Sequence, residues 1–211
     1  FYIWWAHPEV FTACLLMLAL LMASDGRHGP AMLVASLAST HNPPVFIVTL
    51  LIAGWAMVSA QRTGLLRPAV FLRESIKWLP WGGVSALIAA LPAAYFLFFL
   101  GVSNPIVASG SADFSLISLG RLFSMFFDLN MGLIVGAPGL VLVFLVLFSV
   151  VALRTANWRW QGQAWVLSLA AFSAVLMALP ALATTNWNHG QTVYSRYAYW
   201  IGVPLAAGLI H

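Results

Sequence analysis

The chain has 211 residues, of which 62% are hydrophobic and 7% charged, and its formal net charge is +4. Soluble domains carry about a quarter charged residues, so this composition excludes a water-soluble fold. The basic residues form no stripe that could follow a phosphate backbone, which excludes nucleic acid as a partner. Cys14 is the single cysteine and cannot form an internal disulfide. The composition therefore predicts an all-α protein, a polytopic transmembrane helical bundle.

Hydropathy and turn residues predict about seven membrane segments, since one crossing needs about 20 apolar residues. In chain order these segments are residues 8–24, 30–40, 44–60, 79–101, 131–153, 163–184 and 199 onward. The second is short for a full crossing, and a broken helix continuing toward Asn42 is one explanation. Breaks of this kind survive at membrane depth only where protein or water covers them.

Residues 114–128 predict one further helix, amphipathic and lying in the membrane interface. Polar side chains recur there every three or four residues, at Ser115, Ser118, Arg121 and Asp128. An anchor helix with no catalytic part explains the pattern equally well. The chain begins without an initiator Met and stops within an apolar run. We therefore expect residues 1–211 to be one transmembrane domain fragment, incomplete at both ends.

The basic residues predict the orientation, because Lys and Arg collect in cytoplasmic loops. With the amino terminus outside, all of them except Arg121 and Arg196 fall in inside loops. The same orientation places most polar candidates outside. These are Glu9, Asp113, Asp128, His7, His41 and His189. Any chemistry is therefore expected on the extracytoplasmic side.

The first two candidate motifs flank the early segments. In HPEVFT, Pro8 and Glu9 are favourable at a helix start and need no function to explain them. The alternative is that His7 and Glu9 face a cavity and transfer protons or bind sugar hydroxyls. In HNPP, the prolines predict a simple tight turn. The alternative is a turn that presents His41 and Asn42 to a substrate.

Two later motifs carry further candidates. The segment NWNHGQTVYSRYAYW, residues 186–200, places Arg196 in a helix-start turn, and arginine suits bidentate phosphate recognition. A snorkelling or ion-paired Arg196 is the alternative, and the aromatic residues alone fit an interfacial belt. In FFDLNMGLIVGAPG, Asp128 is explained by capping of the following segment, or by pairing with Arg121. The outer acids lack metal-ligand spacing.

These motifs resemble segments of the polytopic C-type membrane glycosyltransferases, which use a polyprenyl-phosphate sugar as donor. The resemblance lies in HPEVFT, ASTHNPP, FDLNMGLIVGAPG and NWNHGQTVYSRYAYW, and the last two look like bacterial mannosyl- and arabinosyltransferase relatives. It implies transfer of a sugar from lipid phosphate to a glycan, lipid or protein acceptor of the cell envelope. The site would face the extracytoplasmic side of the bacterial cytoplasmic membrane.

The resemblance also implies roles for individual residues. Glu9 and His7 would be catalytic, and Arg196 and His189 would hold the donor phosphate. Further substrate-binding positions would be Asn188, Tyr194, Arg121, Asp128, His41 and Asn42. The family's usual aspartate of the first outer loop would lie before Phe1, so these residues alone would be catalytically incomplete. No cofactor is indicated with certainty, and a divalent metal stays open.

Two other classes of function compete with this interpretation. A secondary transporter would explain broken helices and internal prolines. Transporters, however, place ionisable groups near the bilayer midplane, and the predicted segments are almost free of them. A non-catalytic, lipid-handling membrane subunit fits the composition as well as an enzyme does.

Overall fold

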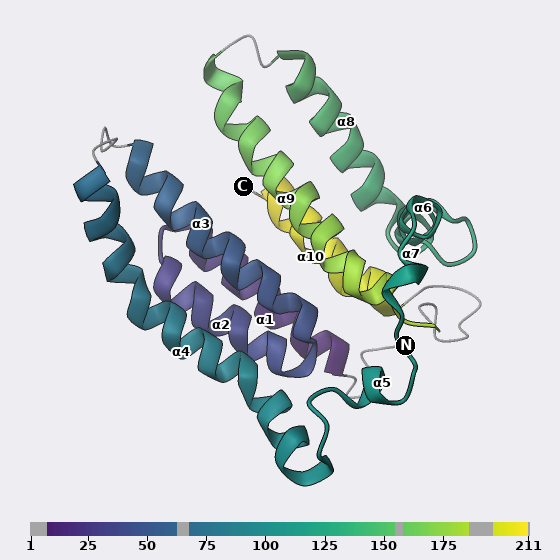
Figure 1. The fold of residues 1–211 in the computed structure, drawn as a ribbon. Coiled ribbons are helices and arrows are strands. Elements are labelled where there is room, and N and C mark those ends of the chain that lie inside the picture. The colour runs from purple at the N-terminus through teal and green to yellow at the C-terminus, as the bar shows by residue number, and fades with distance from the viewer. Residues whose placement is uncertain (1–7, 63–67, 155–157, 186–195, 211) are drawn as a thin grey trace. The chain divides into compact units, whose positions relative to one another are not determined.

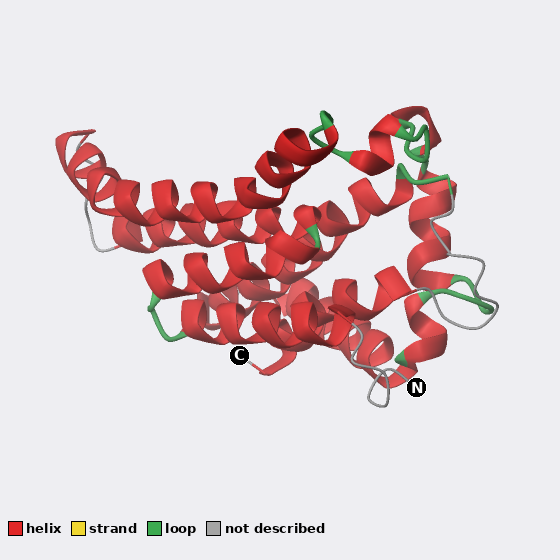
Figure 2. Ribbon diagram, turned by 90° about the horizontal axis from the view of Figure 1, so that it is seen from below, coloured by secondary structure: helices red, strands yellow, loops and turns green. Residues whose placement is uncertain are grey.

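The computed structural model describes residues 8–62, 68–154, 158–185 and 196–210 (Figure 1). These residues form ten α-helices and two short 3-10 helices, and they form no strand (Figure 2). The elements are α1 (Pro8–Ser24), α2 (His28–His41), η1 (Pro43–Val45), α3 (Phe46–Arg62), α4 (Pro68–Leu100), α5 (Pro105–Ala108), η2 (Phe114–Leu116), α6 (Leu119–Phe127), α7 (Leu133–Gly136), α8 (Pro138–Arg154), α9 (Trp158–Leu182) and α10 (Arg196–Ile210). The all-α class is confirmed.

The helices group into two compact units. Unit 1 comprises Phe1–Ala13 and Pro105–His211, and unit 2 comprises Cys14–Asn104. Helix α1 contributes to both, since the boundary lies at Ala13. That residues 1–211 act as one transmembrane domain stays a prediction.

Unit 2 is built on the mutual packing of α2, α3 and α4, which lie side by side (Figure 1). Small residues of α2 allow this close packing, and Ala31, Ala35 and Ala38 are fully buried. The hydroxyls of Ser36 on α2 and Thr49 on α3 lie 3.2 Å apart and satisfy each other inside the core. A buried hydroxyl left alone would cost about 1–3 kcal/mol.

The HNPP motif forms the tight connection between α2 and α3. Helix α2 continues regularly to His41, Asn42 adopts an extended conformation, and the two prolines begin η1. The simple turn is thereby confirmed. The broken helix proposed for residues 30–40 is wrong, because α2 is one continuous helix from His28 to His41.

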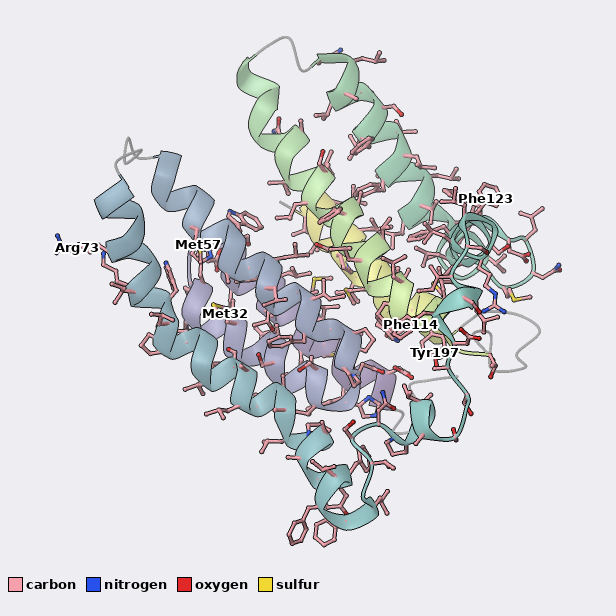
Figure 3. The ribbon with its side chains drawn as sticks, viewed as in Figure 1. Met32, Met57, Arg73, Phe114, Phe123 and Tyr197 are labelled. Atoms are coloured by element: carbon pink, nitrogen blue, oxygen red, sulfur yellow. The ribbon has the colours of Figure 1, made fainter. Side chains whose placement is uncertain are left out.

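Helix α4 is longer than hydropathy indicates. It runs for 33 residues, about 50 Å at 1.5 Å per residue, and begins at Pro68 rather than at residue 79. Charged side chains in its first turns lower the local hydropathy, but Pro68 is well suited to the first helical position. Arg73, at this end of the helix, is exposed (Figure 3).

In unit 1, α8 and α9 run antiparallel, and α10 packs along α9 (Figure 1). Gly208 permits the closest approach, since a β-carbon there would lie 2.8 Å from the Ala170 side chain. Two predicted helices are divided. Residues 131–153 contain α7 and α8, separated at Ala137, because a residue before proline is disfavoured in the α conformation.

The predicted interfacial helix over residues 114–128 is also divided. Residues Phe114–Leu116 form η2, and the amphipathic helix is α6 alone. Ser118 separates them: its backbone is extended, and its hydroxyl accepts a hydrogen bond from the Arg121 amide at 3.2 Å. Serine competes for backbone donors in this way and favours N-cap positions over helix interiors. A single helix through Ser118 is therefore wrong.

One helical stretch within the described residues, Ile76–Leu100 in α4, is long and apolar enough to cross a membrane. The other apolar helices have 10–17 residues. The α4 stretch is hardly covered by the rest of the protein, with Leu87 70% and Phe98 83% exposed. A contiguous apolar surface of this extent requires a cover other than water.

Candidate functional site

Arg121 joins α6 to the carboxyl end of α9. Its Nη1 donates to the carbonyl oxygen of Leu182 at 2.9 Å and to that of Thr184 at 3.3 Å. The last carbonyls of a helix lack partners within the helix, and the negative end of the helix dipole favours a cation there. Arg121 thus acts as a cap supplied from a separate helix, 61 residues away from Leu182 in the sequence.

The backbone adds a second connection at the same place. The amide of Asp113 donates to Ala183 at 2.8 Å, and the amide of Thr185 donates to Ser111 at 3.0 Å. Ala112 and Thr184 face each other in the resulting antiparallel bridge. We call Ser111–Asp113, Arg121 and Leu182–Thr185 together the α9 junction. It ends immediately before residues 186–195, which carry three predicted site residues.

Asp113, within the α9 junction, has a local role. Its carboxylate accepts a hydrogen bond from the amide of Ser115 at 2.8 Å and caps the start of η2. This bond holds the pKa of the Asp113 carboxyl below its ordinary value. Asp113 is exposed, and its carboxyl is ionised at neutral pH. Its negative charge can therefore offset the positive charge of Arg121 in the α9 junction.

Asp128 closes the turn after α6. Its Oδ1 accepts from the amide of Asn130 at 2.7 Å and from that of Met131 at 3.2 Å. The predicted pairing of Asp128 with Arg121 is wrong, because both side chains bind backbone groups of different segments. The predicted capping of the following helix is also wrong, because the N-cap of α7 is Gly132 and the Asp128 carboxylate instead closes the turn between α6 and α7.

Glu9 lies in the first turn of α1 and is 2% exposed. A carboxylate that serves only to complement a helix start can stay in water, whereas burial of a carboxylate costs free energy. Thr12, one turn later, is fully buried as well. The helix-start explanation accounts for the position of Glu9 in the sequence but not for its burial.

Helix α10 begins at Arg196, whose side chain lies outside the described residues. The aromatic residues that follow are not surface residues. Trp200 is 1% exposed, and Tyr197 packs edge-on against it at 5.9 Å between ring centroids. An interfacial belt is therefore the wrong explanation for Tyr197 and Trp200, which form core contacts of α10.

The structure unites some predicted site residues and separates others. Glu9, Arg121, Asp128 and Arg196 all belong to unit 1. His41, which is exposed, and Asn42 belong to unit 2. The remaining predicted positions lie outside the described residues: His7, Asn188, His189 and Tyr194. Among the described residues no group of three or more His, Cys, Asp or Glu side chains could hold a metal ion.

Unit 1 contains an apolar cavity of about 330 Å³. One side is the apolar face of α6, and α8, α9 and α10 form the others. The lining residues are Leu119, Leu122, Phe123, Phe126, Phe127, Val141, Phe144, Leu145, Ala171, Val175 and Leu205. Cavities of 300–1,000 Å³ are typical of small-ligand sites. A lining of this kind suits a hydrocarbon chain and offers no hydrogen bond to a polar ligand.

Helix α6 directs a polar side chain toward the protein and exposes apolar side chains, the reverse of a surface helix on a soluble protein. The Arg121 side chain donates to a carbonyl oxygen at the end of α9, and Met125 is fully buried, while Leu119 is 84% and Phe123 64% exposed. The apolar face of the helix is thus partly exposed, and the exposed Leu119 and Phe123 also belong to the lining of the cavity. The apolar spacing could have indicated this face, whereas nothing local indicated the cavity, which needs α8, α9 and α10.

Unit 2 holds a buried histidine that the sequence did not indicate. His28, at the start of α2, is 9% exposed and lies between the rings of Trp55 and Trp78, at centroid distances of 6.4 and 5.8 Å. Its Nδ1 has no hydrogen-bond partner within the described part of the chain. His28 and the two tryptophan rings thus form an aromatic cluster within unit 2.

The fold and this region define an all-helical protein with exposed apolar helices and a hydrocarbon-like cavity beside a polar junction. Comparison of the chain with protein families, characterised proteins and solved structures yields no match.

Proposed function

We propose that the chain is part of a membrane glycosyltransferase that moves a sugar from a polyprenyl-phosphate donor to an acceptor on the extracytoplasmic side. The observation that carries the proposal is the apolar cavity of unit 1. A donor of this class has a long hydrocarbon tail next to a charged head group. Its tail needs an apolar site that lies close to polar side chains.

The proposal includes a polytopic arrangement in the membrane. The exposed apolar surface of α4 supports it, because contact of this surface with water costs free energy and contact with lipid does not. The apolar stretches of α8 and α9, Pro138–Arg154 and Val166–Leu182, are each about 26 Å long, slightly shorter than a hydrocarbon core of about 30 Å. In this arrangement α6 lies in the interface, with Phe123 directed to lipid.

The cavity is large enough for part of a prenyl tail. A volume of 330 Å³ holds on the order of ten carbon groups, if each takes up about as much space as a water molecule, about 30 Å³. That corresponds to about two five-carbon prenyl units. Longer tails would continue into the bilayer past the exposed face of α6.

The polar residues of unit 1 supply the remaining chemistry in this proposal. Glycosyl transfer requires a base for the acceptor hydroxyl and cationic stabilisation of the departing phosphate. Glu9 is proposed as the base, with His7 as its partner in proton transfer. Arg196, at the start of α10, and His189 are proposed to hold the phosphate, where the helix amino terminus also favours an anion.

A non-catalytic lipid-handling subunit is the second candidate, because the same cavity could hold any lipid chain. A transfer assay separates the two candidates. The full-length protein that contains this chain is reconstituted in vesicles with radiolabelled polyprenyl-phosphate sugar. Transfer of label to an acceptor supports the enzyme. Binding of the donor without transfer under any acceptor condition would support the lipid-handling function instead.

Filling the cavity tests the place of the donor tail. Ala171→Phe introduces a ring into the space, so we expect the KM for a long-chain donor to rise about tenfold, which corresponds to about 1.4 kcal/mol of lost binding. A water-soluble donor with a very short tail should keep its KM. Val146→Phe is the matched control, because Val146 on α8 is 60% exposed and does not line the cavity. Equal KM values for Ala171→Phe and wild type would place the tail elsewhere.

A further inference from the structure

We propose that Arg121 is a positioning residue: through the α9 junction it holds the chain at the end of α9, from Leu182 to Thr185, in place, and it does not hold the donor phosphate itself. The effect on sugar transfer rests on the proposed function, whereas the effect on the end of α9 does not.

The geometry of Arg121 supports this assignment. Nη1 carries two hydrogens, and the two carbonyl oxygens of Leu182 and Thr184 lie within hydrogen-bond distance of it. The Nη1 end of the guanidinium is thereby engaged with backbone. A phosphate bound across the two terminal nitrogens would have to displace one of these carbonyls from Nη1.

The backbone around Arg121 shows what the side chain holds in place. The bridge between Ala112 and Thr184 is a single pair, flanked by only two backbone hydrogen bonds. An isolated bridge of this size has little stability of its own. Arg121 binds the carbonyl of Thr184, the bridging residue itself, and that of Leu182, two positions before it. One charged side chain thus reinforces a weak pairing.

The position of Arg121 is fixed from its own side as well. Ser118 caps the first turn of α6 through the Arg121 amide, and Met125, one turn after Arg121, is fully buried. The arginine therefore projects from a helix that is anchored at its start and at its core. Loss of the Arg121 bonds would therefore free the segment from Leu182 to Thr185 to shift relative to α6.

A disulfide can replace the arginine and so test this role. Ala112 and Thr184 form a non-hydrogen-bonded antiparallel pair, whose α-carbons are typically about 4.5 Å apart, within the 4.4–6.8 Å range of disulfides. The full-length protein receives Cys14→Ser to remove its native thiol, then Ala112→Cys and Thr184→Cys. Arg121→Gln is added to this background, and each protein is assayed oxidised and reduced. The double-cysteine protein with Arg121 intact is the matched control.

Two measurements are made on each protein. The first is hydrogen exchange at the amides of Asp113 and Thr185, whose bonds close the bridge. We expect Arg121→Gln to speed this exchange about tenfold and the disulfide to restore it. The second is sugar transfer, for which we expect a large loss in Arg121→Gln and recovery of most of the control rate on oxidation.

The outcomes separate the inference from the proposed function. Unchanged exchange in Arg121→Gln would overturn the positioning role. Restored exchange without restored transfer would also overturn it, because the guanidinium would then be needed at the donor. If the control protein transfers no sugar at all while exchange responds as expected, the positioning of the α9 end stands and the glycosyltransferase function falls.

Discussion

At the scale of single residues, the polar side chains of unit 1 differ in their surroundings. Arg121 and Asp128 are satisfied by backbone groups of neighbouring segments. Glu9 differs from both in its depth, because it is 2% exposed in the first turn of α1. Under the proposed function Glu9 is the base of the reaction, and Arg121 and Asp128 hold neighbouring backbone segments in place.

Replacement of Glu9 tests this at the same scale. Glu9→Gln keeps the shape of the side chain but removes the base, so transfer should fall on the order of 10²–10⁴-fold, the usual contribution of general acid–base catalysis. Initial rates in reconstituted vesicles measure the effect. Asp25→Asn is the control, because Asp25 is an exposed loop acid. Equal rates for the two variants would remove Glu9 from the reaction.

At the scale of elements, the turn between α6 and α7 is the most tightly constrained connection in unit 1. A β-carbon at Gly132 would lie 2.6 Å from the Asp128 nitrogen, 2.7 Å from the Asp128 oxygen and 2.9 Å from the Ser124 oxygen. All three atoms are backbone and cannot move aside as a flexible side chain does. The requirement for glycine is thus one of space, since its φ of −73° is open to any residue.

Gly132→Ala should therefore open this turn and destabilise the protein by about 1–3 kcal/mol, the usual cost of overpacking. Thermal unfolding in detergent should show a lower Tm. Gly139→Ala makes a matched comparison, because Gly139 lies in α8 with nothing within 4 Å of its would-be β-carbon, and alanine is favoured there by about 1 kcal/mol. A Tm for Gly132→Ala at or above that of wild type would show that the turn is not constrained.

The elements also show what local sequence can predict. Apolar runs indicated most helices, because burial and lipid exposure both select apolar residues over such lengths. The ends of the helices were harder to predict. Pro68 starts α4 among charged residues, Ser118 interrupts an otherwise regular pattern, and Pro138 begins α8 directly after the break that ends α7. The partners of Arg121 were beyond prediction, because its contacts with Leu182 and Thr184 depend on how distant helices pack.

At the scale of the whole molecule, charge is sorted within each unit. In unit 1 the α9 junction and Asp128 lie at one end of α8 and α9, and Arg154 closes α8 at the other end (Figure 1). In unit 2 Arg27 precedes α2 and Arg62 ends α3, whereas His41 lies at the opposite end of both helices. Unit 2 thus has Arg27 and Arg62 at one end, whereas in unit 1 Arg121 and Arg154 lie at opposite ends. Basic residues collect on the cytoplasmic side of a membrane, so the proposed arrangement places the Arg27 and Arg62 end of unit 2 there.

A labelling experiment tests whether the two ends of unit 1 face opposite sides of a membrane. Leu129, in the loop after α6, is 80% exposed, and Leu153, near the end of α8, is 86% exposed. After Cys14→Ser, each receives a single cysteine as Leu129→Cys or Leu153→Cys. In intact cells a membrane-impermeant maleimide should label Leu129→Cys, whereas Leu153→Cys should react only after permeabilisation. Since α8 between them spans about 26 Å, labelling of both from the same side would mean that α8 does not cross. The cavity beside it would then lack access from the bilayer, and the proposed donor could not reach it.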